Sequence, residues 1–345
     1  MKQIFQGLLL LGMTGLLTRG AILTPLPRTQ AHPAQAGVLA RREALAEVQA
    51  IVQLHNLSLP PPVVTGSPQA TLAIAQEMLT PTIQAVIGNR QVPLLVDTGA
   101  STTLLSKALV TQLQLEGQTI ASDRLTSAVA GRDCPSMEAT LHQLPPLSLG
   151  GIQVDRLRGL AFAQTEIPQD WAGVLGMNFL QAFDLSINPQ AQQLTLRPPS
   201  PLPRSQRAQA IPLQRQLNVL VGPVRINGQG PFTLLFDTGA EGTFISPAVA
   251  KAASLGEIPQ EAVRVRGFCG LEPAVRLSIP SLDIGPHRLS TVQVIVLDSA
   301  VIKTLQVDGI LGQNVLSQFE QHWRFPAHSL PDSQAQGSLL LTAPN

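Results

Sequence analysis

The chain has 345 residues, of which 44% are hydrophobic and 13% are charged, with a formal net charge of +1. This length allows two domains of ordinary size, and the low share of charged residues is typical of a packed, β-rich protein rather than a disordered one. The near-neutral charge gives no electrostatic basis for binding nucleic acid or an anionic membrane, and the absence of Tyr beside only 10 Phe and 2 Trp leaves few rings for base stacking.

Residues 1–36 have the pattern of an export signal. Lys2 supplies a positive end, Ile4–Leu17 an apolar stretch, and Ala34-Gln35-Ala36 a small-x-small cleavage site. The apolar stretch is short for a membrane span, so we expect cleavage, with an uncleaved N-terminal anchor as the alternative. In both cases we expect the rest of the chain to be exported to the periplasm, the cell envelope or the extracellular space.

Residues 37–79 are predicted to form a helix followed by a proline-rich linker. Apolar residues recur at helical spacing within Arg41–Leu54. Leu57–Ala70 then contains four prolines and one glycine, a composition typical of a linker.

Residues 80–197 are predicted to form a first β-rich unit. Its elements, in chain order, are a hairpin, a short helix or strand-turn, a second hairpin, a pair of strands and a strand leading into a short helix: Thr82–Ala100, Leu104–Leu115, Leu125–Leu141, Leu147–Phe162 and Val174–Phe183. The prolines of residues 198–210 forbid a continuous helix or central strand, so this stretch is predicted to be the linker to a second unit. Residues 211–345 repeat the order of elements.

One seven-residue pattern occurs twice, at Leu94–Ala100 and Leu234–Ala240. Each copy has three apolar residues followed by Asp-Thr-Gly-Ala, and the two aspartates, Asp97 and Asp237, stand 140 residues apart. Average composition predicts about 0.1 Asp-Thr-Gly tripeptides in a chain of this length. A turn after a buried strand would explain one copy, but it does not explain a matched pair.

A second pattern is repeated downstream of each aspartate. Val174–Leu180 and Ile310–Leu316 both read apolar-Leu-Gly-x-Asn-apolar-Leu, and the glycines follow Asp97 and Asp237 by 79 and 75 residues. The chain is therefore predicted to be an internal duplication of a unit of about 120 residues.

A duplicated Asp-Thr-Gly turn has a direct chemical use. Two carboxylates that meet across a twofold axis cannot both ionise easily, so the pair holds one proton. The ionised member acts as general base on a water between them, and the protonated member polarises the carbonyl of the bond to be broken. Asp97 and Asp237 are the predicted catalytic pair. The residues predicted to support them, by close backbone approach and by hydrogen bonds across the axis, are Thr98, Gly99, Thr238 and Gly239.

This chemistry needs no cofactor, and none is expected. The six histidines show no helical i, i+4 pairing and the chain has only two cysteines, which argues against a zinc site.

At these residues the sequence resembles the retropepsin-like aspartic proteases. The Asp-Thr-Gly-Ala form, the repeated apolar-Leu-Gly pattern and the unit length are similar to that family over nearly all of residues 80–342. Ala100 and Ala240 stand where pepsins usually carry Ser or Thr, and no Tyr is present to serve as the pepsin flap residue. The resemblance implies an all-β fold, mainly β with short helices, of two closed β-barrel units related by pseudo-twofold symmetry, with the aspartates at their interface.

The activity that this resemblance implies is aspartic endopeptidase, acting on a peptide or protein substrate as a monomer with an intramolecular pseudo-dimer. Two alternatives keep the fold without the reaction: a catalytically degenerate peptide-binding protein and an envelope scaffold protein. Both would tolerate the loss of one aspartate, and both aspartates are present, so hydrolysis is favoured. Glu241 adds a negative charge where the first repeat has Ser101.

The flap of each unit is placed only by the order of the elements. The flap candidates are Ala130, Gly131, Gly267 and Phe268. The only cysteines, Cys134 and Cys269, fall in the same two regions, and an exported protein can form disulfides. We therefore expect either a bridge between the flaps or two unrelated small core residues.

Overall fold

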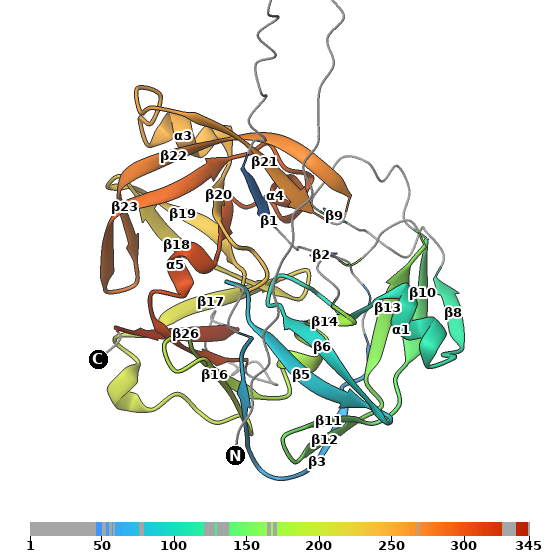
Figure 1. The fold of residues 1–345 in the computed structure, drawn as a ribbon. Helices are drawn as coiled ribbons and strands as arrows, with labels where there is room; N and C mark the ends of the chain where they lie inside the picture. The colour runs from blue at the N-terminus through green and yellow to red at the C-terminus, as the bar shows by residue number, and fades with distance from the viewer. Residues whose placement is uncertain are drawn as a thin grey trace, which may run out of the picture. The chain divides into compact units, whose positions relative to one another are not determined.

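The computed structural model describes residues 46–49, 53–54, 57, 59–75, 79–120, 128–129, 138–163, 167, 171–267, 269–325 and 336–343. Residues 44–345 belong to one unit, within which we call residues 80–197 the first lobe and residues 211–345 the second lobe. The described residues form mostly strands, with α-helices of only four to six residues, so the predicted fold class, mainly β with short helices, is confirmed (Figure 1). Among the described residues, a pairing that closes the ring of strands is found in the second lobe alone. The export signal predicted at residues 1–36 lies outside the described residues, and the domain boundaries stay predictions.

The first lobe is built on a ten-stranded sheet. Its strand order is β3-β12-β11-β5-β6-β14-β7-β13-β10-β8. The bounds of its strands are β3 Val63–Gly66, β5 Thr82–Ile87, β6 Arg90–Val96, β7 Leu104–Leu105, β8 Gly117–Ile120, β10 Ala139–Gln143, β11 Leu147–Leu149, β12 Ile152–Asp155, β13 Arg158–Phe162 and β14 Gly173–Leu175. Its helices are α1 Lys107–Gln112 and α2 Met177–Leu180.

The second lobe repeats this arrangement inside a fourteen-stranded sheet, whose order is β1-β21-β22-β23-β20-β24-β19-β18-β17-β26-β25-β15-β16-β4. The bounds of its own strands are β17 Ile211–Gln216, β18 Val219–Ile226, β19 Gln229–Phe236, β20 Thr243–Ile245, β21 Glu261–Gly267, β22 Gly270–Ile284, β23 His287–Val296, β24 Gly309–Leu311, β25 Glu320–Arg324 and β26 Gly337–Thr342. Its helices are α3 Pro247–Ala252, α4 Ala300–Leu305 and α5 Gln313–Leu316.

The two lobes differ in how their strands close on themselves. In the second lobe the long strand β22 also pairs with β18, at Arg225 with Asp283, which closes a ring of strands. In the first lobe the corresponding strand is divided into β10 and β11 by Pro145 and Pro146. Pro145 and Pro146 remove two consecutive ladder donors at that point, whereas β22 continues through its two separate prolines, Pro273 and Pro280.

Both lobes contribute strands to the same stretch of sheet. Strands β15 (Asp184–Asn188) and β16 (Gln193–Arg197) of the first lobe continue into β25 and β26 of the second. At the junction, β15 and β25 pair antiparallel, with Leu185 opposite Trp323. β4 (Ala70–Ala73) and β17 flank this stretch on its two sides, and the linker between β16 and β17 contains only the 3-10 helix η2 (Arg204–Gln206).

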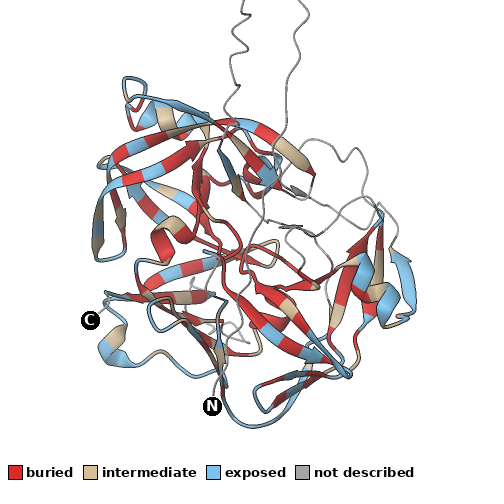
Figure 2. Ribbon diagram, in the orientation of Figure 1, coloured by how far each residue is buried: buried red, intermediate tan, exposed pale blue. Residues whose placement is uncertain are grey.

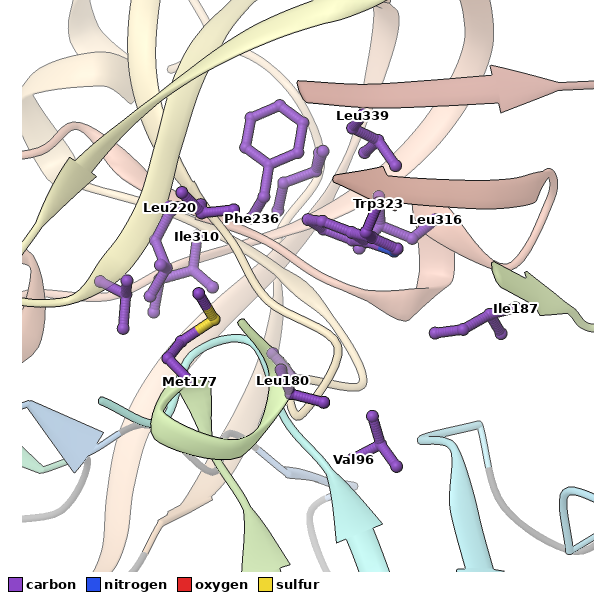
Figure 3. Close-up of a cluster of buried hydrophobic side chains, with 14 of the residues drawn as sticks. Val96, Met177, Leu180, Ile187, Leu220, Phe236, Ile310, Leu316, Trp323 and Leu339 are labelled. Atoms are coloured by element: carbon purple, nitrogen blue, oxygen red, sulfur yellow. The ribbon is translucent and has the colours of Figure 1, made fainter. Parts of the chain in front are cut away.

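A single buried cluster runs through both lobes. Its members come from the strands before each Asp-Thr-Gly loop, from helices α2 and α5, and from the sheet that both lobes share (Figure 3). Labelled members are Val96, Met177, Leu180, Ile187, Leu220, Phe236, Ile310, Leu316, Trp323 and Leu339. Figure 2 shows buried residues concentrated where the lobes meet. Burial on this scale fixes the lobes against each other, because each buried aliphatic or aromatic side chain contributes about 1.5–3 kcal/mol.

The segment before the first lobe differs from its prediction. The helix predicted for Arg41–Leu54 is wrong for the described part, where β1 (Glu47–Gln49) and β2 (Gln53–Leu54) are strands. β1 pairs with β21 and β2 with β9 (Ala128–Val129). The backbone N–H and C=O groups at the edges of β21 and β9 offer hydrogen-bond partners to this segment. This tertiary pairing overrides the helical spacing of its apolar residues. The predicted linker likewise contains β3 and the first residue of β4.

None of the helices in the described residues is long and apolar enough to cross a bilayer.

Candidate active site

Each Asp-Thr-Gly loop follows a central strand whose last three residues are buried on both faces. β6 pairs in parallel with β14, and β19 pairs in the same way with β24. At the end of each pair the aspartate amide bonds to the neighbouring strand, Asp97 N to Leu175 O at 3.1 Å and Asp237 N to Leu311 O at 3.0 Å. Strands buried on both faces read as continuous apolar runs, which explains the three apolar residues ahead of each aspartate.

The residue after the glycine in each repeated apolar-Leu-Gly pattern is hydrogen-bonded to the backbone of the Asp-Thr-Gly loop in the same lobe. Met177 N donates to Ala100 O at 2.8 Å, and Gln313 N donates to Ala240 O at 2.8 Å. A Cβ atom on Gly176 would lie 2.7 Å from Ala100 O, and no side chain fits at that distance. The glycine of the downstream pattern is therefore required by the close approach of the two backbones.

The two loops are tied to each other by four hydrogen bonds between the lobes. Thr98 N donates to Thr238 Oγ1 at 3.0 Å, and Thr238 N donates to Thr98 Oγ1 at 3.0 Å. Each hydroxyl in turn donates to the strand of the opposite lobe, Thr98 to Phe236 O at 2.8 Å and Thr238 to Val96 O at 2.7 Å. Both threonines are fully buried, so each loop is positioned by the other.

The two carboxyl groups are held in the same way on both sides. Gly99 N donates to Asp97 Oδ1 and Gly239 N donates to Asp237 Oδ1, each at 2.7 Å. The Oδ2 atom of each aspartate is buried and has no hydrogen-bond donor among the described residues. A Cβ atom built on Gly99 would lie 2.6 Å from Asp237 Oδ1, and one on Gly239 would lie 2.6 Å from Asp97 Oδ1. Each glycine is therefore the residue that lets the opposite carboxyl approach.

Burial gives both carboxyl groups raised pKa values. Burial, followed by the charge of Asp237, raises the pKa of Asp97 well above its usual range. Burial also raises the pKa of Asp237 to about 7, against the opposing effect of the Asp97 carboxyl and the amides of Gly239 and Ala240. The pair thus tends to keep a proton at a pH where isolated aspartates are ionised, as two carboxyls that share a site must.

The predicted site residues divide into those that the structure brings together and those that it does not describe. Asp97, Asp237 and their neighbouring Thr and Gly residues form the single site just described. Gly267 is buried at the end of β21, opposite Gly270. Ala130, Gly131, Phe268 and Cys134 lie outside the described residues.

Cys269 lies at the junction of the lobes. It is 2% exposed and packs in a smaller cluster with first-lobe residues that include Leu95 and Ala100. Cys269 is disulfide-bonded, and no described cysteine is free. The tip of the second-lobe hairpin therefore packs against the first lobe.

Sequence reasoning missed a matched pair of supporting residues. Thr103 N donates to Asn178 Oδ1 at 2.7 Å, and in the second lobe Thr243 Oγ1 donates to Asn314 Oδ1 at 2.8 Å. Each asparagine then donates to a strand carbonyl of its own lobe. Both threonines stand six residues after an aspartate and both asparagines two residues after the repeated glycine, so aligning the repeats would have revealed them.

Among the described residues, no group of three or more His, Cys, Asp or Glu side chains is placed to hold a metal ion. What this arrangement can do chemically is share one proton between two buried carboxyls and leave their Oδ2 atoms available to a water or a carbonyl.

Comparison with known proteins supports the two-unit organisation. Residues 83–182 match the family model described as gag-polyprotein putative aspartyl protease, and residues 222–315 match the one described as aspartyl protease. The chain is also similar to the crystal structure of a retropepsin-like aspartic protease from Rickettsia conorii, at 18% identity over 40% of this chain and 94% of that one, with a TM-score of 0.28. A TM-score this low carries no weight in the assignment. Comparison with curated proteins gives no match.

The two family matches together cover more than half of the chain, fall one in each lobe, and each contains one Asp-Thr-Gly loop. The chain therefore belongs to the aspartyl proteases, with one matched unit in each lobe.

Proposed function

We propose that the protein is an aspartic endopeptidase in which Asp97 and Asp237 activate one water for attack on a peptide bond. The observation that carries this proposal is the pair of buried carboxyl groups, held by matched glycine amides on loops that are hydrogen-bonded across the lobes. A protein that only bound peptides would need neither two matched carboxyls nor the raised pKa values that let them share a proton.

In this mechanism the proton distribution decides the roles. One carboxylate of the pair is ionised and accepts a proton from the water, while the other stays protonated and donates a hydrogen bond to the substrate carbonyl. The amides of Gly99 and Gly239 fix the Oδ1 atoms, so the reaction uses the Oδ2 atoms. When the tetrahedral intermediate collapses and its C–N bond breaks, the proton taken from the water passes to the leaving amine, and the pair again holds one proton.

The test is a pair of single substitutions in the full-length chain, Asp97→Asn and Asp237→Asn. Each should lower the kcat of peptide hydrolysis at least about 10²-fold, because each removes one half of the acid–base pair. Asp298→Asn is the matched control, since its side chain is 58% exposed and pairs only with the exposed Lys303. Full activity in either Asp97→Asn or Asp237→Asn would overturn the proposal. Peptide binding without hydrolysis in the wild type would instead support the peptide-binding alternative.

We further propose that the protein acts after export and as a monomer. Export rests on the signal-like pattern of residues 1–36, and cell fractionation with N-terminal sequencing of the mature chain would check it. The monomeric state rests on the hydrogen bonds between Thr98 and Thr238 of the same chain. Activity that rises with the square of the protein concentration would contradict it.

A further inference from the structure

A short segment ahead of the first lobe contacts both halves of the active-site region. It comprises the described residues Ala46–Gln49, Gln53–Leu54 and Leu57, and we call it the N-terminal segment. Strand β1 runs parallel to the outer edge of β21, with Val48 opposite Val265, and Arg264 N donates to Ala46 O at 3.0 Å. Figure 1 shows β1 lying along β21.

The same segment then pairs with the other lobe. β2 is antiparallel to β9, with Gln53 opposite Val129, and only three residues separate β2 from β1. β21 and β9 belong to the two regions from which the flaps were predicted. A stretch of extended chain that adds to a strand of each lobe is bound as peptides are bound by strand addition, through main-chain hydrogen bonds.

One residue of the catalytic region also holds this backbone. Glu241, four residues after Asp237, donates its amide to Gln49 O at 3.0 Å and accepts Gln49 N on Oε2 at 3.0 Å. Gln49 is 4% exposed. Both bonds go to the main chain of the segment, so Glu241 recognises an extended peptide without regard to its side chain.

Two apolar side chains of the segment, Val48 and Leu57, pack against the body of the protein. A Cβ atom on Gly242, next to Glu241, would be 3.1 Å from Val48 Cγ1, so Val48 rests on the backbone there. Leu57 packs against the smaller cluster, which contains Ala100 of the first-lobe loop. The segment therefore contacts the backbone just after the second-lobe turn and the cluster to which Ala100 belongs.

From these contacts we propose that the N-terminal segment takes the place of an extended peptide substrate and inhibits the chain's own active site. This inference rests on the peptidase function proposed above. Both catalytic carboxyls are fully buried in this arrangement, so a substrate reaches them only after a rearrangement. Displacement of the segment supplies that rearrangement.

The contacts that hold the segment are weak enough to be reversed. Glu47 pairs with Arg264 at 2.5 Å and with Arg266 at 2.7 Å, and all three side chains are partly exposed. Exposed ion pairs contribute little individually. A substrate that offers its own backbone to β21 and Glu241 would make comparable bonds, so it competes on nearly equal terms.

The test is a double variant of the full-length protein, Glu47→Arg with Val48→Asp, which sets a like charge against both arginines and an acid against Gly242. The matched control is Glu257→Arg with Val63→Asp, because both residues are exposed and lie outside the segment. Three quantities are measured: kcat/KM for a peptide substrate, amide hydrogen exchange of residues 261–267, and the dissociation constant of a fluorescent synthetic peptide with the sequence of residues 44–59.

We expect the double variant to show at least about tenfold higher kcat/KM and at least about tenfold tighter peptide binding than the wild type, because the competing conformation is lost. Exchange of residues 261–267 should rise in this variant and not in the control. Faster exchange without gains in turnover and binding would make the segment a purely structural strand and overturn the proposal, as would no change in any quantity. If no form of the protein cleaves peptides, the proposed function fails, and peptide binding alone decides this inference: tighter binding by the variant supports it, and equal binding overturns it.

Discussion

Replacing Thr98 by valine removes one hydroxyl from the junction of the lobes and changes the shape of the side chain little. That hydroxyl donates to Phe236 O at 2.8 Å and accepts Thr238 N at 3.0 Å. All three residues are fully buried, so valine leaves one carbonyl and one amide without partners and without water. Each orphaned group costs about 1–3 kcal/mol. We therefore expect the free energy of unfolding to fall by about 2–6 kcal/mol.

The assay is equilibrium unfolding in urea, followed by the fluorescence of Trp171 and Trp323, which are both buried. Thr98→Ser keeps the hydroxyl and should cost only about 1 kcal/mol for the lost methyl group. Thr71→Val is the matched control, because Thr71 is exposed and bonds only to Thr195 Oγ1 at 3.2 Å, and its cost should stay within about 0.5 kcal/mol. If Thr98→Val costs no more than Thr71→Val, the cross-lobe hydrogen bonds do not hold the loops together.

Four other predictions follow, three from the same site and one from Cys269. Burial raises the pKa of Asp237 from 3.8 to about 7, and the pKa of Asp97 is raised as well. The contribution of the two carboxyls to the free energy of unfolding is therefore present below about pH 4 and is lost as pH rises through 7. Unfolding in urea should show this loss in the wild type and a smaller loss in Asp237→Asn. The same raised values predict that kcat/KM falls as pH drops below about 7, and a rate maximum at strongly acid pH would contradict this. Gly239→Ala should lower kcat about 10²-fold by displacing the opposite catalytic carboxyl, whereas Gly256→Ala, with no atom within 4 Å of the added Cβ, should have no effect. Because Cys269 is disulfide-bonded and Cys134 is the only other cysteine, thiol titration of the native, unreduced protein should find no free thiol, and two per chain would rule the bridge out.

The catalytic loops were predictable because their sequence is dictated by packing at one place. A parallel strand buried on both faces must be apolar throughout, which makes the runs before Asp97 and Asp237 easy to recognise. The glycines follow from the close approach of backbone and carboxyl, and no other residue type fits there. When such a unit occurs twice, the repeat itself predicts that the two loops meet.

The N-terminal segment was not predictable, because its conformation is decided by its partners. Leu45, Val48, Ile51 and Val52 have helical spacing, yet β1 is a strand because the edge of β21 offers it main-chain partners. Pairing across more than 200 residues of sequence leaves no local signal. The length of β22, fifteen residues, was also hidden, since nothing in its polar and apolar pattern separates one long strand from the two shorter strands of the first lobe.

The position directly after each Asp-Thr-Gly-Ala differs between the two repeats in its side chain and its contacts. In the first lobe it is Ser101, whose short side chain reaches the adjacent turn of the second lobe: it donates to Leu217 O, and Asn218 Nδ2 donates to Ser101 O at 2.8 Å. In the second lobe it is Glu241, whose longer side chain extends to the backbone of Gln49. The matched contacts of Asp97 and Asp237 require the same residues in both loops up to Ala100 and Ala240. After these alanines, no such contact requires the two repeats to have the same residue. An extended peptide would therefore meet a carboxylate that accepts its amide on the second-lobe side and an occupied serine on the first-lobe side. A single chain with two unequal repeats can distinguish the two directions of a bound peptide, which a dimer of identical subunits cannot do.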